Sequence, residues 1–205
     1  MRLQIASIQY PVRVLGPGNR LGIWLQGCLK RCPNCLSVDF IPLKGGASYS
    51  IEQLCELVIF HHRNYPLQGL TISGGEPMLQ WVALENLLCT LKTEIQKLNV
   101  MLFSGYTYSG NGLFSDAPSV TAPDIENLVD LLIDGEYVEA LNKGQFMRGS
   151  GNQRHLFFNS EFEKEFRQYE NDSEKARRMQ LFAKTQFLAG IPERNFGHYM
   201  EEPGG

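Results

Sequence analysis

The chain has 205 residues and a formal net charge of −3, enough length for one α/β domain with a full hydrophobic core. This charge gives no basic surface for nucleic acid, and no apolar run approaches the ~20 residues of a membrane span, so neither partner is expected. The first residues lack the apolar region of a secretory signal, and an odd count of five cysteines predicts a reducing, cytoplasmic location.

Strands and helices are predicted to alternate through the first two thirds of the chain. Two β-rich stretches, 3–7 and 12–15, come first, and short apolar strands follow at 21–26, 70–72, 100–103 and 131–133. Helices are expected to begin after Ser50, which forms a capping box with Gln53, and to cover 84–98 and 125–129. Such alternation predicts parallel β/α units with right-handed crossovers. Polar segments follow the strands and should therefore meet at one edge of the sheet.

The sequence changes character after residue 158. Ser160 and Glu163 predict a capping box that opens a charged amphipathic helix, and a second helical stretch is expected around 173–187. The last residues predict a flexible tail. We therefore expect a core domain at 1–158 and a helical C-terminal extension with a flexible tail at 159–205.

Three cysteines follow the strand at 21–26 with the spacing C-x3-C-x2-C: Cys28, Cys32 and Cys35. Three thiolates can hold a cubane iron–sulfur cluster and leave one iron without a protein ligand, where a further molecule can bind. The alternative is a zinc site made by the three cysteines and a histidine. The candidates for that fourth ligand are His61, His62, His155 and His198.

Two features together resemble the radical S-adenosylmethionine (SAM) superfamily. The first is the cysteine spacing, and the second is the segment 73–77, Ser-Gly-Gly-Glu-Pro, which is similar to the GGE motif of that superfamily. The glycines permit close backbone approach, and Glu76 supplies a carboxylate for an ammonium group. An ordinary βα turn in which Glu76 complements a helix N-terminus is the alternative.

Further segments narrow the resemblance to one group, the activating proteins of anaerobic ribonucleoside-triphosphate reductases. The proteins of this group activate glycyl radical enzymes. These segments are 14–18, 25–28, 104–107, 133–135 and the run Arg-Gly-Ser-Gly-Asn-Gln-Arg at 148–154. The resemblance covers roughly residues 10–158. It implies an α/β fold, namely an abbreviated, open radical SAM (β/α) partial barrel with a parallel sheet.

The resemblance also implies the chemistry and the partners. A [4Fe-4S] cluster and SAM generate a 5′-deoxyadenosyl radical, which abstracts hydrogen from a glycine of a partner glycyl radical enzyme. An electron donor such as flavodoxin or ferredoxin reduces the cluster. No general base is needed, and no catalytic residue is assigned beyond those that hold the cluster and SAM.

The resemblance carries over to individual residues as follows. The metal ligands are Cys28, Cys32 and Cys35, and the cofactor-binding residues are Asn34, Leu36, Gly74, Gly75, Glu76, Ser104, Tyr106 and Asp134. Asn34 replaces an aromatic residue that many superfamily members carry next to the adenine. A substrate or partner loop is expected at Arg148, Asn152 and Gln153, whose amide and guanidinium donors suit an anionic group or a backbone.

Several alternatives remain at this point. For Tyr106, a half-buried loop aromatic is an equal alternative to a ligand contact, and for Asp134 the equal alternative is the first residue of an Asp-Gly turn. For Asn152 and Gln153, the alternative is a structural role in tying their loop. Cys55 and Cys89 are predicted to be core thiols on helices. A radical SAM enzyme that modifies another peptide or small molecule, and a zinc-bound interaction module, are the rival functions.

Overall fold

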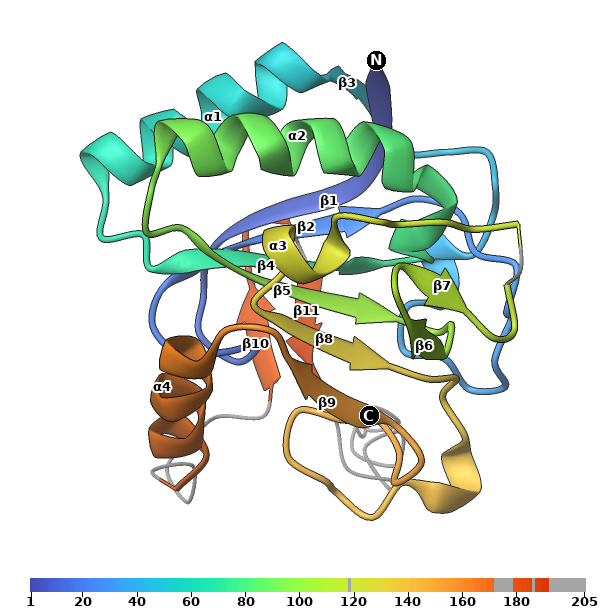
Figure 1. Cartoon of the computed structure of the whole chain (residues 1–205). Coiled ribbons are helices and arrows are strands. Elements are labelled where there is room, and N and C mark those ends of the chain that lie inside the picture. Colours follow the sequence, from blue (N-terminus) through green and yellow to red (C-terminus); the bar gives the residue numbers. More distant parts are fainter. Residues whose placement is uncertain (118, 172–178, 186, 192–205) are drawn as a thin grey trace, which may run out of the picture.

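The computed structural model is a mixed α/β structure built on one seven-stranded sheet (Figure 1). It describes residues 1–117, 119–171, 179–185 and 187–191. The predicted flexible tail and His198 lie outside these residues. Within them, no helix is both long enough and apolar enough to cross a bilayer.

The sheet has a parallel centre and antiparallel edges. Its strand order is β3-β1-β2-β4-β5-β8-β9, with the bounds β1 Arg2–Val12, β2 Arg20–Leu25, β3 Ala47–Ser50, β4 Gly69–Gly74, β5 Asn99–Ser104, β8 Leu131–Asp134 and β9 Arg154–Phe157. Strands β2, β4, β5 and β8 are parallel neighbours, which confirms the predicted parallel β/α units. The antiparallel strands β3 and β9 at the two edges were not predicted.

Three helices cover one face of the sheet (Figure 1): α1 (Ile51–Asn64), α2 (Trp81–Glu94) and α3 (Ile125–Leu128). The predicted capping box is present, because Ser50 accepts from the Gln53 amide while Gln53 bonds back to Ser50. Leucines at helical spacing on α2 pack against alternate residues of the strands and form the larger hydrophobic core. Short connecting elements complete this part: η1 Val38–Phe40, η2 Pro77–Gln80, η3 Glu139–Leu141, and the hairpin of β6 (Tyr108–Gly110) and β7 (Leu113–Phe114).

The opposite face of the sheet is covered by the C-terminal extension, helix α4 (Ser160–Asn171) and the hairpin of β10 (Met179–Phe182) and β11 (Phe187–Gly190) (Figure 1). A second apolar cluster lies between them and the sheet, and it includes Trp24, Met101, Phe162 and Phe166. The helix that begins at residue 160 was predicted. The prediction of a second helix around 173–187 was wrong for residues 179–182 and 187. Residues 172–178 are outside the described part. The segment is extended because its aromatic side chains Phe182 and Phe187 pack on this face of the sheet.

Candidate functional site

The three cysteines lie on a loop that begins at the carboxyl end of β2 and is closed by backbone hydrogen bonds. The Gly27 amide donates to the Phe40 carbonyl (2.7 Å), and the Cys28 amide donates to the Ile41 carbonyl (3.0 Å). Gly27 turns the chain out of the strand with φ of 97°, a conformation that favours glycine. The two ends of the cysteine loop, residues 27–41, are therefore joined to each other directly after β2.

The thiols of the cysteine loop are half-buried and close enough to influence one another electrostatically. Burial raises the pKa of Cys32 and of Cys35, and the neighbouring thiols raise it further. Among the described residues, no three His, Cys, Asp or Glu side chains are grouped closely enough to hold one metal ion. The thiols are thus neighbours on one loop without forming a preassembled mononuclear site.

The segment 73–77 packs directly against the start of the cysteine loop. The Glu76 amide donates to the Gly27 carbonyl (2.7 Å), and the Gly75 amide donates to the Leu25 carbonyl (2.7 Å). A Cβ at Gly75 would lie 2.2 Å from the Gly27 carbonyl oxygen, and one at Gly74 would lie 2.3 Å from the Leu25 nitrogen. Both positions therefore require glycine for the two segments to touch.

The Glu76 carboxylate is buried and joins the ends of two strands. One oxygen accepts from the Ser104 hydroxyl (2.8 Å) and the Met78 amide (3.0 Å), and the other accepts from the Gly105 amide (2.7 Å). Burial raises the pKa of Glu76 to about 7 against the opposing effect of these donors and of Lys30. Glu76 caps η2, as the βα-turn alternative predicted. This second oxygen and the Lys30 Cγ each lie 3.3 Å from the position that a Cβ would take at Gly105.

Lys30 connects the cysteine loop to two other strand-end segments, and the sequence did not predict this role. Its ammonium bonds to Asp116 in the segment after β7 and lies 3.8 Å from Glu136 after β8. It also lies 5.2 Å from the centre of the Tyr106 ring. Burial would lower the pKa of Lys30, but the bond to Asp116 and the two acidic charges raise it overall. The strand-end segments therefore meet at one edge of the sheet, as their positions after parallel strands predicted.

The remaining predicted cofactor residues occupy this edge in different ways. Asn34 donates to the Glu139 carboxylate (2.7 Å), whereas Leu36 exposes 48% of its surface. Tyr106 is buried, and its carbonyl accepts from the Gly135 amide (3.1 Å). Contact with a cofactor stays a prediction for each of these residues.

Asp134 is fully buried and paired. Its carboxylate accepts from the Tyr108 amide (2.7 Å), from the Arg154 Nε (2.9 Å) and from a second Arg154 nitrogen. These bonds join β8 to β9 and to the segment after β5. Asp134 therefore has a structural role, and its contact with SAM or with the substrate stays a prediction.

The run 148–154 is tied to the segment after β8. Gln153 accepts from the Gly149 amide (2.7 Å) and donates to the Gly135 carbonyl (2.8 Å), and Asn152 donates to the Glu136 carbonyl (2.7 Å). Arg148 donates to the Gln153 carbonyl (3.0 Å), while its buried Nε finds no hydrogen-bond partner among the described residues. The loop-tying role of Asn152 and Gln153 is therefore present, and a partner-binding role stays a prediction.

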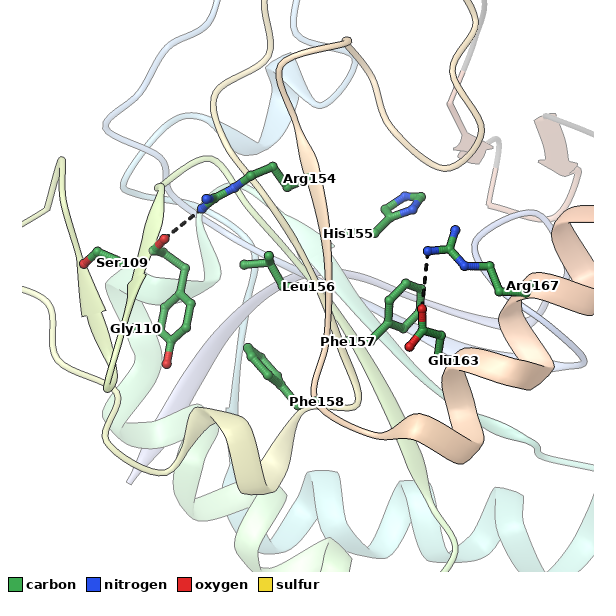
Figure 2. A pocket seen from close by; sticks show the side chains of 10 residues that line it. Ser109, Gly110, Arg154, His155, Leu156, Phe157, Phe158, Glu163 and Arg167 are labelled. Carbon is green, nitrogen blue, oxygen red and sulfur yellow. Dashed lines mark hydrogen bonds and ion pairs between the residues drawn. The ribbon is translucent and has the colours of Figure 1, made fainter.

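A shallow pocket lies beside β9 and does not include the cysteine loop. Figure 2 shows Ser109 and Gly110 on one side of this strand, and Glu163 and Arg167 of α4 on the other. His155 and Phe157 line the pocket between them. Because no cysteine and no residue of the segment 73–77 lines this pocket, we do not assign the predicted chemistry to it.

The other cysteines are separate from the loop. Cys55 on α1 is buried in the core, as predicted, whereas Cys89 on α2 is exposed, so the prediction of a core thiol was wrong there. Position 89 follows the buried Leu87 and Leu88 and falls just beyond the apolar stripe of the helix.

Comparison with known families identifies the class of protein. Residues 14–156, which contain the cysteine loop and every strand-end segment described above, match the 4Fe-4S single cluster domain family. The chain belongs to this family. Membership in a 4Fe-4S domain family decides against the zinc-bound interaction module.

Two named relatives each match about 70% of this 4Fe-4S single cluster domain protein. The anaerobic ribonucleoside-triphosphate reductase-activating protein of Vibrio cholerae is 30% identical over 149 residues, 70% of this chain and 92% of that protein. The protein of the same name from Enterobacteria phage T4 is 28% identical over 143 residues, 69% of this chain and 85% of that protein. The resemblance predicted from the motifs is confirmed.

Two more distant matches are shorter. The pyruvate formate-lyase-activating enzyme of Listeria monocytogenes is 33% identical over 79 residues, 38% of this chain and 32% of that enzyme. The crystal structure of QueE from Escherichia coli aligns with a TM-score of 0.40 and 18% identity, over 54% of this chain and 55% of that one.

Proposed function

We propose that this chain is a [4Fe-4S]- and SAM-dependent radical enzyme that activates a partner glycyl radical enzyme of the anaerobic ribonucleotide reductase type. One observation carries the proposal. The three-cysteine loop of a 4Fe-4S family member is fixed against a Gly-Gly-Glu segment at the edge of the sheet where the other strand-end segments meet. The named relatives act in the activation of such enzymes, which supports the choice of substrate.

The residues present suit a cluster with one open iron. We assign Cys28, Cys32 and Cys35 as its ligands, because they are three thiols on one closed loop within the matched region. A thiolate set of three leaves one iron of a four-iron cluster without a protein ligand. When bound, the cluster and SAM supply a 5′-deoxyadenosyl radical, which takes a hydrogen atom from the Cα of the partner's glycine.

The neighbouring segments provide the rest of the cofactor site in this proposal. Gly74 and Gly75 let the Gly-Gly-Glu segment pack against the cysteine loop, and we assign the Glu76 oxygen that accepts from the Gly105 amide to the ammonium group of SAM. Asn34 and Leu36 of the cysteine loop are assigned to the adenine. Ser104 and Tyr106 are assigned to the ribose or carboxylate.

We propose the open partial barrel for residues 1–158 and treat 159–205 as an addition to it. The family match ends at residue 156. The described sheet does not close, since β3 and β9 each pair with one strand only. An open side suits a reaction in which a polypeptide segment must enter.

The proposal also names partners and a location. A polypeptide of the glycyl radical enzyme is the substrate, and residues Arg148, Asn152 and Gln153 lie on the loop assigned to it. A flavodoxin or ferredoxin is the proposed electron donor. We place the enzyme in the reducing cytoplasm, where thiolate ligands of the cluster are maintained.

The test is SAM cleavage by anaerobically reconstituted protein. With a strong reductant, the wild-type protein should form 5′-deoxyadenosine, and Cys28→Ala, Cys32→Ala and Cys35→Ala should each abolish it. Cys89→Ala is the matched control, because this exposed thiol lies on α2; it should retain cluster and cleavage. Glu76→Ala should weaken SAM binding. A fully loaded cluster that cleaves no SAM would contradict the proposal.

A radical SAM enzyme with another peptide or small-molecule substrate is the second candidate. It is favoured by the extension after residue 156, which lies beyond the family match. Electron paramagnetic resonance separates the two candidates, because only the first predicts a glycyl radical in a large partner enzyme.

A further inference from the structure

The aromatic side chain of Phe187, on the C-terminal hairpin, links that hairpin to the cysteine loop. Its ring meets Trp24 of β2 edge-to-face at 4.6 Å between centroids and stacks on Phe40 at 5.9 Å with an interplanar angle of 18°. Offset stacking and edge-to-face contacts are both favourable aromatic geometries. Phe187 is thus held between the strand that leads into the cysteine loop and the residue near the end of that loop.

The backbone of Phe40, whose ring contacts Phe187, is hydrogen-bonded to the loop that carries the cysteines. Its carbonyl accepts from the Gly27 amide (2.7 Å), and a Cβ at Gly75 would lie 2.8 Å from the same oxygen. Its amide donates to the Ser37 carbonyl (2.9 Å), two residues after Cys35. Displacement of the Phe40 ring would therefore disturb both ends of the cysteine loop and its contact with the Gly-Gly-Glu segment.

Trp24 fixes the other side of Phe187. It is 4% exposed, and its register partners are Ser7 on β1 and Ser73 on β4. A Cβ at Gly22 would lie 2.5 Å from the Trp24 ring, so the ring occupies space that only glycine leaves free. Trp24 therefore packs Phe187 against a buried part of the sheet, whereas Phe40, which is partly buried, belongs to the cysteine loop itself.

We propose that Phe187 is a positioning residue that clamps the cysteine loop onto the sheet and so fixes the relative placement of the three thiols. The inference rests on the proposed role of those cysteines as cluster ligands. It assigns a function to the hairpin, which lies outside the region matched by the 4Fe-4S single cluster domain family. The hairpin is held in place along β1, where Gln180 accepts from the Arg13 amide (2.9 Å) and donates to the Pro11 carbonyl (2.7 Å).

The first test measures thiol alkylation by iodoacetamide in the reduced, full-length, cluster-free protein, followed by mass spectrometry. Phe187→Ala should accelerate modification of Cys28, Cys32 and Cys35 roughly fivefold, because loss of the ring contacts favours local opening of the loop. Leu181→Ala is the matched control on the same hairpin, since this side chain is 67% exposed. It should leave all rates unchanged.

The other two cysteines are internal references. Exposed Cys89 should react equally fast in both variants, and buried Cys55 reports opening of the whole core. Unchanged rates at the three loop cysteines would overturn the proposal. Equal acceleration at Cys55 would also overturn it, because it would show general destabilisation.

Two further variants keep the proposal testable if Phe187→Ala fails to fold. Phe187→Leu keeps apolar volume but loses ring stacking, so it should give an intermediate acceleration. Phe40→Ala should also accelerate modification of the loop cysteines, and the double variant should not exceed Phe187→Ala by much, since both substitutions remove the shared Phe40–Phe187 contact. Additive effects in the double variant would contradict the clamp.

The loaded protein provides the last measurement. In Phe187→Ala, the change that SAM produces in the electron paramagnetic resonance spectrum of the reduced cluster should be lost or reduced, whereas Leu181→Ala should retain it. An unchanged response in Phe187→Ala would overturn the positioning role. If wild-type protein binds no cluster, the proposed function fails, and the alkylation rates still decide whether the clamp exists.

Discussion

The buried ion pair of Asp134 with Arg154 provides a prediction for a single residue. Asp134 is fully buried, whereas about half of the Arg154 side chain is exposed. Arg154→Ala leaves the carboxylate with the Tyr108 amide alone, so we expect the free energy of unfolding to fall by about 2–3 kcal/mol. Arg167→Ala, which breaks exposed pairs with Glu163 and Glu170, should cost less than about 1 kcal/mol. Urea unfolding of both variants is the measurement, and equal losses would contradict the assignment.

His155 should make stability depend on pH. Burial, with the charge of Arg148 adding to it, lowers the pKa of His155 from 6.5 to about 4, and its buried Nε2 has no hydrogen-bond partner in the part of the chain that the structure describes. Arg167 lowers the pKa as well, whereas Glu170 and the Met147 backbone oppose the shift. The unfolded chain therefore binds the proton first as the pH falls, and stability is lost between pH 6.5 and about 4.

The measurement is the free energy of unfolding at pH 7 and pH 5. For wild-type protein, His155 should account for a loss of roughly 1–2 kcal/mol over this interval. In His155→Phe, the titratable group is absent, so the loss should be smaller by that amount. A variant with the same pH dependence as wild type would show that His155 does not contribute.

The start of helix α4 provides a prediction for an element, because the structure places its cap one residue before the predicted position. The Asn159 side chain accepts from the Glu161 amide (3.0 Å) and the Phe162 amide (3.2 Å) and donates to Asp130 (2.6 Å). Asn159→Ala should therefore cost about 1–2 kcal/mol of unfolding free energy. Ser160→Ala is the control and should cost little. If thermal unfolding showed a larger loss of stability for Ser160→Ala than for Asn159→Ala, the predicted capping box of Ser160 would be supported instead.

Sequence patterns predicted the elements whose cause is local. Ser50 and Gln53 cap α1 as their spacing indicated, and the four parallel strands follow from apolar runs that end in glycine-containing turns. The cysteine spacing and the Gly-Gly-Glu segment are likewise local patterns, and the structure brings the two segments into contact, whereas their role as a cofactor site stays a prediction.

Contacts between distant segments could not be read from these patterns. The bond of Lys30 to Asp116 spans 86 residues, and the contact of Phe187 with Trp24 depends on where the hairpin packs. The residues of β10 have no strict alternation, so only the apolar face of the sheet decides that they are extended. The exposure of Cys89 was missed because a thiol carries no strong pattern of its own.

At the scale of the whole molecule, one sheet carries two apolar cores. Helices α1 to α3 cover the first, and α4 with the C-terminal hairpin covers the second. The cysteine loop contacts the second core through Phe40. Although α4 and the strands β10 and β11 lie beyond the family match, their packing should therefore contribute to the stability of the strands that position the site.

Phe166 tests this dependence, because it is fully buried in the second core and contacts the rings of Phe146, His155 and Phe157. Phe166→Ala should lower the free energy of unfolding by about 3–5 kcal/mol. Phe60→Ala on α1 is the matched control, since that ring is 53% exposed, and it should cost less than about 1 kcal/mol. Because both cores share the sheet, unfolding of the Phe166 variant followed by circular dichroism and by tryptophan fluorescence should give coincident transitions at lower denaturant concentration. Separate transitions would mean that the extension folds as an independent unit and does not support the core.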